Sequence, residues 1–114
     1  MVYNIKEIFT DYVVFIKIGN FYECYNDDAC IISYLFGYKI KNMVSNDKTC
    51  DFPLSSINKV ISNLKTRCIN YILIDKVHNY GEIDKMNFKK KNNYNIVKDK
   101  ALEHINKIDR INKI

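Results

Sequence analysis

Apolar residues recur along the chain with two periods, one typical of helices and one typical of strands. Helical spacing predicts helices over residues 5–12, 27–36, 56–67 and 97–113. Stretches that are β-branched, aromatic or alternating predict strands over residues 13–18, 21–25, 38–44 and 69–77. We expect residues 45–51 to form a loop, and residues 78–95 to form a loop with one edge strand.

The pair Gly19-Asn20 lies between the first two strands and is typical of a tight hairpin turn. Helices and strands alternate along the rest of the chain. The sequence therefore predicts an α/β fold, with a mixed β-sheet that contains an N-terminal β-hairpin and is surrounded by helices. The length of 114 residues suits a single domain, 1–114, in which 97–113 forms a C-terminal amphipathic helix.

Residues typical of helix ends support these boundaries. Asn26 can cap the helix that follows it, with Asp27 and Asp28 in the first turn, where the helix dipole favours negative charge. Gly37 suits the position just after the end of that helix. Pro53, followed by two serines, indicates the start of the next helix.

The net charge of +5 permits a polyanionic partner but does not require one. The chain is rich in Lys, Asn and Ile together, which is typical of a coding bias towards A and T. The basic run at residues 89–93, KKKNN, therefore has two readings, a solvated loop or a contact to phosphates, and we favour the loop.

The cysteines and histidines do not predict a metal site. Cys24, Cys30, Cys50 and Cys68 form no Cys-x-x-Cys pair, and both histidines lie far from them in sequence. We expect reduced, buried thiols in a cytoplasmic protein. The N-terminal segment has no apolar run of the signal-peptide kind, and the longest apolar stretch is too short to span a bilayer, so we expect no membrane partner.

No arrangement of residues in the sequence predicts catalysis. The three glycines are widely separated and make no phosphate-binding loop, and there is no Gly-x-Ser-x-Gly motif. No acidic residue is followed two positions later by Lys, as metal-dependent nucleases often require. We therefore expect a protein that is not an enzyme and that needs no cofactor.

The stretch IGNFYECYNDDA, residues 18–29, has an unusual alternation. Side chains alternate along a strand, so Phe21 and Glu23 share one face while Tyr22 and Cys24 share the other. A core Phe21 with a solvated Glu23 at the sheet edge is one explanation. The other is that both side chains project together towards a ligand.

The residues FIKIGNFYECYNDDA resemble the N-terminal mismatch-recognition domain (domain I) of the MutS family, in which the hairpin has the form apolar-Gly-Asp-Phe-Tyr-Glu. The later segment DFPLSSINKVISNLKTRCINYILIDK is similar to that family's Gly-apolar-Pro, helix and strand pattern. Asn20 stands where the family usually has Asp, Asp51 replaces the Gly before Pro53, and Ser55 replaces a His. The likeness runs from about residue 5 to residue 76, and the clamp and ATPase domains of the family have no counterpart in this chain.

The resemblance implies a role for each hairpin residue. Phe21 would enter the minor groove of mismatched or distorted double-stranded DNA, and Glu23 would hydrogen-bond the same base. Because a carboxylate near phosphates is repelled by their charge, basic residues must offset Glu23; Lys17, on the strand that leads into the turn, is the best candidate for such a DNA contact, ahead of Lys39 and Lys41.

Two other functions remain open. The chain could dock on a full-length MutS-like protein, or on itself, through its terminal helix. It could also be a decayed fragment that keeps the fold without a function.

Overall fold

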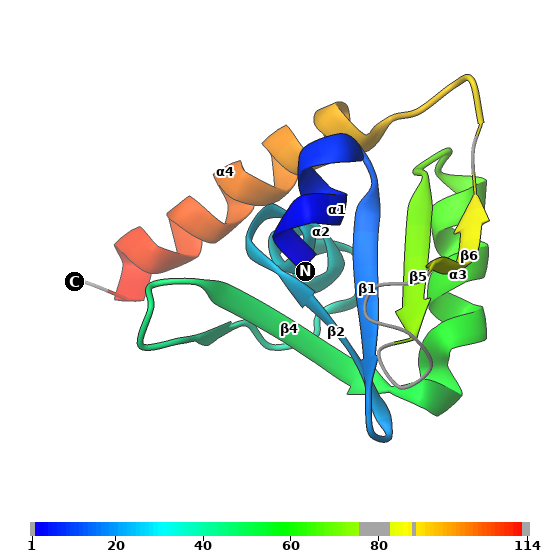
Figure 1. Ribbon diagram of the computed structural model, residues 1–114. Helices are drawn as coiled ribbons and strands as arrows, with labels where there is room; N and C mark the ends of the chain where they lie inside the picture. The colour runs from blue at the N-terminus through cyan, green and yellow to red at the C-terminus, as the bar shows by residue number, and fades with distance from the viewer. Residues whose placement is uncertain (1, 76–82, 88, 113–114) are drawn as a thin grey trace.

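The computed structural model describes residues 2–75, 83–87 and 89–112. Helices and strands alternate through most of this part of the chain (Figure 1). In chain order the elements are α1 (Val2–Ile8), β1 (Val13–Ile18), β2 (Phe21–Tyr25), α2 (Asn26–Phe36), β3 (Lys41–Asn42), β4 (Lys48–Pro53), the 3₁₀ helix η1 (Leu54–Ser56), α3 (Ile57–Thr66), β5 (Tyr71–Asp75), β6 (Ile83–Asn87) and α4 (Tyr94–Asn112).

The six strands form one mixed sheet in the order β3-β4-β2-β1-β5-β6. β1 and β2 form the predicted antiparallel hairpin, in which Ile18 pairs with Phe21. β1 also pairs with β5, in parallel, beginning with Val13 opposite Tyr71. The predicted fold class is thus confirmed, and the edge strand predicted within residues 78–95 is β6, which lies beside β5.

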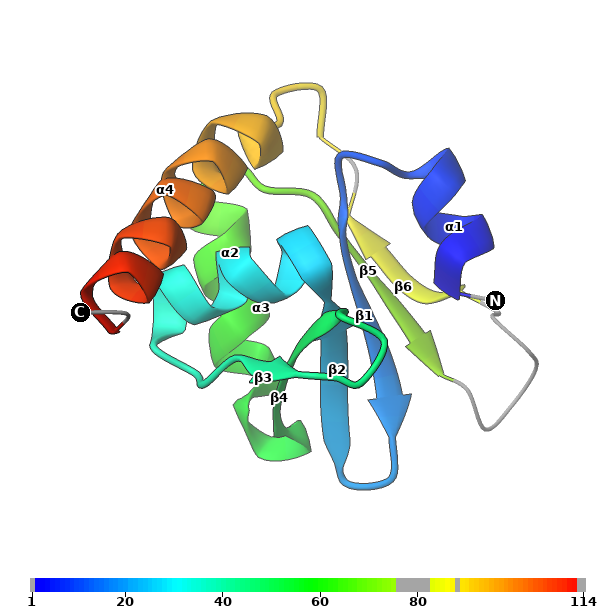
Figure 2. The same cartoon turned by 90° about the vertical axis from the view of Figure 1, so that its left-hand side faces the viewer.

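Helices cover the two faces of the sheet unequally. α2, α3 and α4 lie on one face, and α1 lies on the other (Figure 2). The larger core forms under the three helices, where Phe15 packs edge-to-face against Phe52, with ring centroids 5.5 Å apart. A smaller core under α1 joins Val14 and Ile16 of β1 to β5. β1 is therefore buried on both of its faces.

Two predictions between α2 and α3 were wrong. Of the strand predicted over residues 38–44, only Lys41–Asn42 is a strand, and the loop predicted over residues 45–51 contains the beginning of β4. β4 pairs with the whole of β2, from Phe21 opposite Pro53 to Tyr25 opposite Thr49. Its inward residues Cys50 and Phe52 do alternate with polar ones, but two apolar positions are too few for a strand signal.

Asn26 does not cap α2, contrary to the prediction. It has φ +52° and is the first residue of the helix, and the N-cap position is Tyr25, whose side chain makes no capping hydrogen bond. Its side chain instead contacts the start of β4, because Oδ1 accepts a hydrogen bond from the backbone N–H of Lys48 at 3.0 Å. The predicted helix end is confirmed, since Gly37 has φ +77° and donates its N–H to the carbonyl of Ser33.

Asp28 is a buried contact point for several elements rather than a solvated first-turn residue. Its Oδ1 lies 2.8 Å from Lys6 Nζ of α1 and 2.6 Å from the hydroxyl of Tyr94 in α4. Its Oδ2 accepts the backbone N–H of Val14 at 3.1 Å. Burial raises the pKa of the Asp28 carboxyl, although Lys6 and the hydrogen bonds act in the opposite direction. One carboxylate therefore joins α1, β1, α2 and α4.

α4 begins three residues before the predicted position and packs on α2. Ala101 and Ile105 of its apolar stripe are buried in the larger core, whereas Ile108 and Ile111 near its end are exposed. No helix within the described residues is long and apolar enough to cross a membrane. The four cysteines are free thiols, and three of them are buried. The predictions for residues 76–82, residue 88 and residue 113 lie outside the described residues.

Candidate nucleic-acid interface

The turn at Gly19-Asn20 places Phe21 at one end of the sheet, as the first residue of the interior strand β2. Gly19 has φ +58°, a conformation that glycine adopts without a steric penalty, so the chain reverses within two residues. The carbonyl of Asn20 accepts a hydrogen bond from the N–H of Leu54 at 3.0 Å, which attaches the turn to the end of β4. Phe21 is thereby held between Ile18 and Pro53, and 47% of its side chain is exposed.

The predicted alternation along β2 is confirmed. Tyr22 is only 8% exposed and its ring lies 6.1 Å from that of Phe52, while Cys24 is fully buried. Both belong to the larger core under α2, α3 and α4. Phe21 and Glu23 consequently lie together on the opposite face, so the core explanation of Phe21 is wrong.

Glu23 lies in a half-buried position that is electrostatically unfavourable. Its neighbour on β1 is Ile16, and its neighbour on β4 is another carboxylate residue, Asp51. Like charges directly opposite one another destabilise a pair of strands. Lys41 offsets part of this repulsion, because its Nζ lies 3.3 Å from Asp51 Oδ2. Within the described residues, no hydrogen bond or ion pair engages the Glu23 side chain itself.

A patch of apolar side chains surrounds the exposed ring of Phe21. Ile18 is 39% exposed, and Pro53 on the other side of Phe21 is also exposed. Among the described residues, the smaller core under α1 extends across this face from β5 to Tyr25 of β2 and does not include Phe21. Sequence reasoning missed Ile18, Pro53 and Asp51 as neighbours of Phe21. A two-residue turn is enough to place Ile18 opposite Phe21. The positions of Pro53 and Asp51 could be predicted only by recognising that β4 pairs with β2.

The three predicted basic residues lie in three different places. Lys17 is opposite Tyr22, so it lies on the other face of the hairpin from Phe21, and its Nζ is 3.9 Å from Asp75 Oδ2. Lys41 shares the face of Phe21, since it pairs with Thr49 of β4. Its partner Thr49 is four residues from Pro53, the partner of Phe21, so Lys41 and Phe21 are separated by roughly 13 Å along the strand direction.

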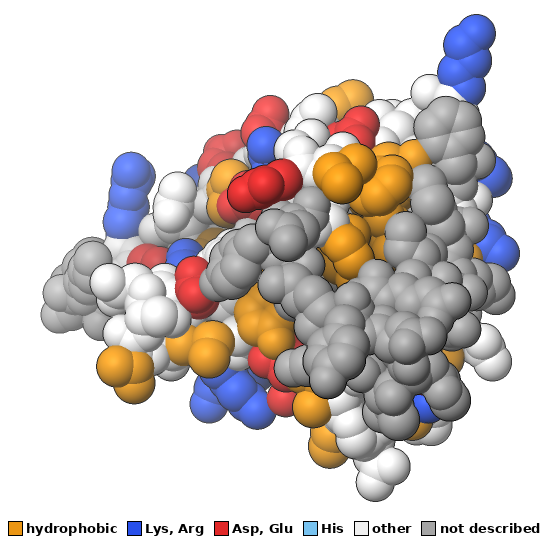
Figure 3. Space-filling view, in the orientation of Figure 1, with side chains coloured by type: hydrophobic (Ala, Val, Ile, Leu, Met, Phe, Trp, Pro, Cys, Tyr) orange, Lys and Arg blue, Asp and Glu red, His pale blue; other side chains and the backbone are white. Residues whose placement is uncertain are grey.

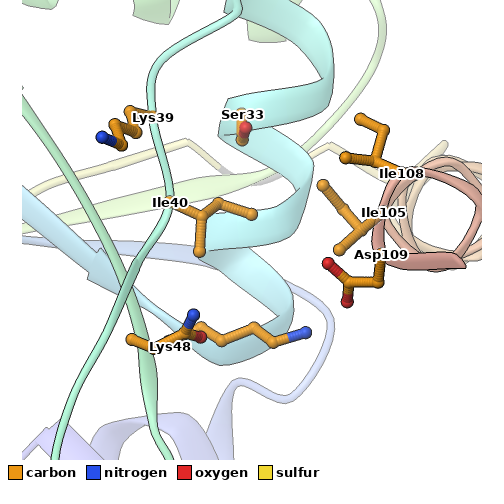
Figure 4. Close-up of a pocket in the computed structure, with 8 residues that line it drawn as sticks. Ser33, Lys39, Ile40, Lys48, Ile105, Ile108 and Asp109 are labelled. Atoms are coloured by element: carbon orange, nitrogen blue, oxygen red, sulfur yellow. The ribbon is translucent and has the colours of Figure 1, made fainter. Parts of the chain in front are cut away.

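Lys39 lies beside α4 rather than beside the hairpin. It lines a cavity of about 310 Å³ between α2, the segment around β3 and the last turns of α4 (Figure 4). In that view its side chain points away from α4, whereas Lys48 extends towards it. Lys41 is therefore the predicted basic residue that the fold brings to the face of Phe21 and Glu23.

The described residues contain no group of three or more His, Cys, Asp and Glu side chains that could hold a metal ion. The chemistry available around Phe21 is an apolar ring, a carboxylate that accepts hydrogen bonds, and a lysine at some distance. An exposed apolar ring is the kind of side chain that minor-groove proteins insert between base steps, and a carboxylate beside it can accept a hydrogen bond.

Comparison with known proteins connects this geometry to a family. The family model for MutS domain I matches residues 1–99, which includes the hairpin and every strand of the sheet. The match ends within α4, so residues 100–112 of that helix lie beyond it. No curated protein matches the chain. Because the match covers most of its length, the chain belongs to the MutS domain I family, whose members are DNA-recognition modules of mismatch repair.

Proposed function

We propose that this module binds mismatched or distorted duplex DNA by inserting Phe21 into the minor groove, where Glu23 hydrogen-bonds the displaced base. One observation carries the proposal. A 47% exposed phenylalanine lies two residues from Glu23 on the same strand face, immediately after a tight turn, and within the described residues the Glu23 carboxylate has no hydrogen-bond or ion-pair partner.

The discrimination would come from the deformability of the DNA. Inserting an apolar wedge costs a few kcal/mol of lost base stacking. A mismatched or unpaired base lowers that cost, because its pairing energy is already lost. The same wedge therefore binds a damaged duplex more tightly than a matched one without reading a base code.

Glu23 is consistent with this mechanism because, among the described residues, nothing donates a hydrogen bond to its carboxylate. A carboxylate near phosphates is repelled by their charge, so it is favourable only if a base donates a hydrogen bond to it. Its position opposite Asp51 is unfavourable in the free protein. A donor from the DNA would compensate for that repulsion.

Basic residues would offset the remaining negative charge. Lys41 on the face of Phe21 and Lys17 on the other face of the hairpin would contact phosphates on the two sides of the inserted ring. A contact from Lys39 requires a duplex that extends towards α4. A single module offers roughly 600–1,000 Å² to DNA, so we expect non-specific binding near 10⁻⁴ to about 10⁻⁶ M that weakens steeply with salt.

The test is fluorescence anisotropy with matched, G·T and one-base-insertion duplexes at two salt concentrations. Phe21→Ala should lose the preference for the two defective duplexes, whereas Lys17→Ala should weaken binding to all three alike. Tyr34→Ala is the matched control, because Tyr34 is a 37% exposed aromatic residue on α2, away from the hairpin. A mismatch preference that persists in Phe21→Ala would refute the wedge.

The exposed end of α4 favours a second candidate function, docking on a MutS-like protein. Ile108 and Ile111 are 40% and 69% exposed, and both lie beyond the residues that the family model matches. If docking were the function, DNA binding would be absent at low salt. Ile111→Lys would then abolish co-purification with a full-length MutS-like protein, while Phe21→Ala would leave it unchanged.

A further inference from the structure

Five basic side chains gather where the end of α3 meets the segment before α4. Lys65 and Arg67 lie at the end of α3, and Lys89, Lys90 and Lys91 lie just before α4. All five are exposed. Within the described residues none of them forms an ion pair with a carboxylate. Arg67 donates from Nε to Asn63 Oδ1 at 2.6 Å, and the rest of its guanidinium is available. We name these five residues the basic platform.

Asparagine side chains fix the backbone of the basic platform. Asn70, which is buried, donates from Nδ2 to the carbonyl of Lys89 at 3.1 Å, and its Oδ1 accepts the N–H of Lys89 at 3.0 Å. Asn93 joins the two segments, because its N–H donates to the carbonyl of Cys68 at 2.7 Å and its Nδ2 to that of Arg67 at 3.0 Å. Asn92 Nδ2 donates to the carbonyl of Asp11 at 2.8 Å.

This arrangement differs from that of a freely solvated loop. A mobile loop can spread its lysines apart, but here the backbone of Lys89 is bound on both its N–H and its carbonyl. The segment that carries Lys89 to Lys91 is therefore attached beside the end of α3, and no carboxylate in the described part of the chain forms an ion pair with its lysines. A fixed group of positive charges attracts polyanions and gains free energy by releasing their counterions.

The basic platform lies at the opposite end of the sheet from Phe21. Asn70 comes directly before β5, whose first residue pairs with Val13 at the start of β1, whereas Phe21 pairs with Ile18 at the end of β1. In Figure 1 the hairpin turn is at the bottom and the segment before α4 is at the top right, and a blue side chain projects there in Figure 3. β1 has six residues, so the two regions are separated by roughly 20 Å.

We propose that the basic platform is a second nucleic-acid contact, which binds the phosphate backbone of duplex DNA without regard to sequence or mismatch. It would add to affinity, while the Phe21 face would decide which duplex is preferred. Contacts to phosphates position a protein on DNA and carry no sequence information themselves. The proposal does not depend on insertion of Phe21.

The test compares two double variants with the same loss of charge. Lys90→Gln/Lys91→Gln removes two charges from the platform and keeps Lys89. Lys100→Gln/Lys107→Gln removes two exposed charges from α4. Binding of matched and G·T duplexes is measured over a series of salt concentrations, after circular dichroism has shown that both variants melt like the wild type.

For the platform variant, we expect the slope of log K against log salt to become shallower by about 2, close to 0.9 for each lost phosphate contact. Its affinity for both duplexes should fall by the same factor, so the mismatch ratio stays unchanged. The α4 variant should behave like the wild type. Equal behaviour of the two double variants, or no measurable binding to matched duplex, would overturn the proposal. The proposal would also be overturned if the platform variant lost binding to phosphatidylserine vesicles while its DNA binding stayed unchanged.

Discussion

The two halves of the sheet differ in how they are covered. Where β1 meets β5, helices lie on both faces, and Val14, Ile16, Ile72 and Ile74 under α1 are each no more than 3% exposed. Where β2 meets β4, the larger core covers one face, but the other face carries the exposed side chains of Phe21 and Pro53. The first half is buried on both faces, whereas the second half is buried on one face and presents the candidate ligand-binding residues on the other.

Two phenylalanines on adjacent strands make this difference measurable. Phe15 of β1 is completely buried, while Phe21 of β2 is 47% exposed. Both are phenylalanines, and they lie only six residues apart in the sequence. A difference in the stability lost when each is replaced by Ala therefore measures how well the sheet is covered at the two positions. The following predictions test that comparison, from the largest expected effect to the smallest.

Phe15→Ala should destabilise the protein most. It removes a fully buried ring and leaves a cavity beside Phe52. Such a change lowers the free energy of unfolding by about 3–5 kcal/mol, a large part of the stability of a small domain. Urea unfolding followed by circular dichroism measures it. A loss below about 1 kcal/mol would show that β1 is not the centre of the core.

Asp28→Ala should be comparably severe, although Asp28 is polar. It removes the acceptor shared by Lys6, Tyr94 and the Val14 N–H, and it leaves buried polar groups without a partner. Breaking a buried pair in this way costs about 3–5 kcal/mol. Asp27→Ala is the control, because that neighbouring carboxylate is exposed and its loss should stay within about 0.5 kcal/mol. Similar losses for both variants would refute the role of Asp28.

Asp28 should also give the stability a defined pH dependence. Burial raises the pKa of its carboxyl in the folded state. The folded protein therefore holds a proton that the unfolded chain releases near pH 3.9. The stability from this proton is fully present below that pH and is lost as the pH rises through the folded-state pKa. The residue at position 28 does not titrate in Asp28→Asn. Urea unfolding should therefore show the wild type losing stability, relative to this variant, as the pH rises from about 3.9 through the folded-state pKa of Asp28. The opposite slope would contradict the assigned direction.

Phe21→Ala should change the stability little. Phe21 is already 47% exposed, so removal of its ring should cost about 1 kcal/mol or less. The melting temperature of this variant, set beside that of Phe15→Ala, is the direct measure of the comparison. A loss of several kcal/mol would place Phe21 in the core and remove the basis for the wedge.

Glu23→Gln should produce the smallest effect, a gain in stability. It removes a negative charge directly opposite Asp51, and relief of a like-charge pair is worth about 0.2–1 kcal/mol. Asp51→Asn should gain less, because it also gives up the ion pair with Lys41. Thermal unfolding at low salt measures both variants. A loss of stability in Glu23→Gln would mean that Glu23 has a structural role in the free protein.

The sequence by itself determined the elements whose signal is local. Apolar periodicity predicted β1, α2 and α3, and the Gly19-Asn20 pair predicted the hairpin. Alternation from that turn placed Phe21 and Glu23 on one face and Tyr22 in the core, because a strand has a fixed period of two. The same alternation also places Lys17 opposite Tyr22, on the face away from Phe21, a step that sequence reasoning had not taken.

Only the tertiary structure decided the features that depend on residues far apart in the sequence. β4 is a strand because β2 offers it a complete edge to pair with, although its own sequence carries Asp51 and Pro53. Asp28 has the sequence position of a solvated first-turn residue, yet it is buried because Lys6 and Tyr94, 22 and 66 residues away, converge on it. The basic platform likewise exists only because Asn70 and Asn93 join the end of α3 to the segment before α4. Hydrogen bonds and pairing across such separations leave no periodic signal in the chain, and so only the folded arrangement reveals them.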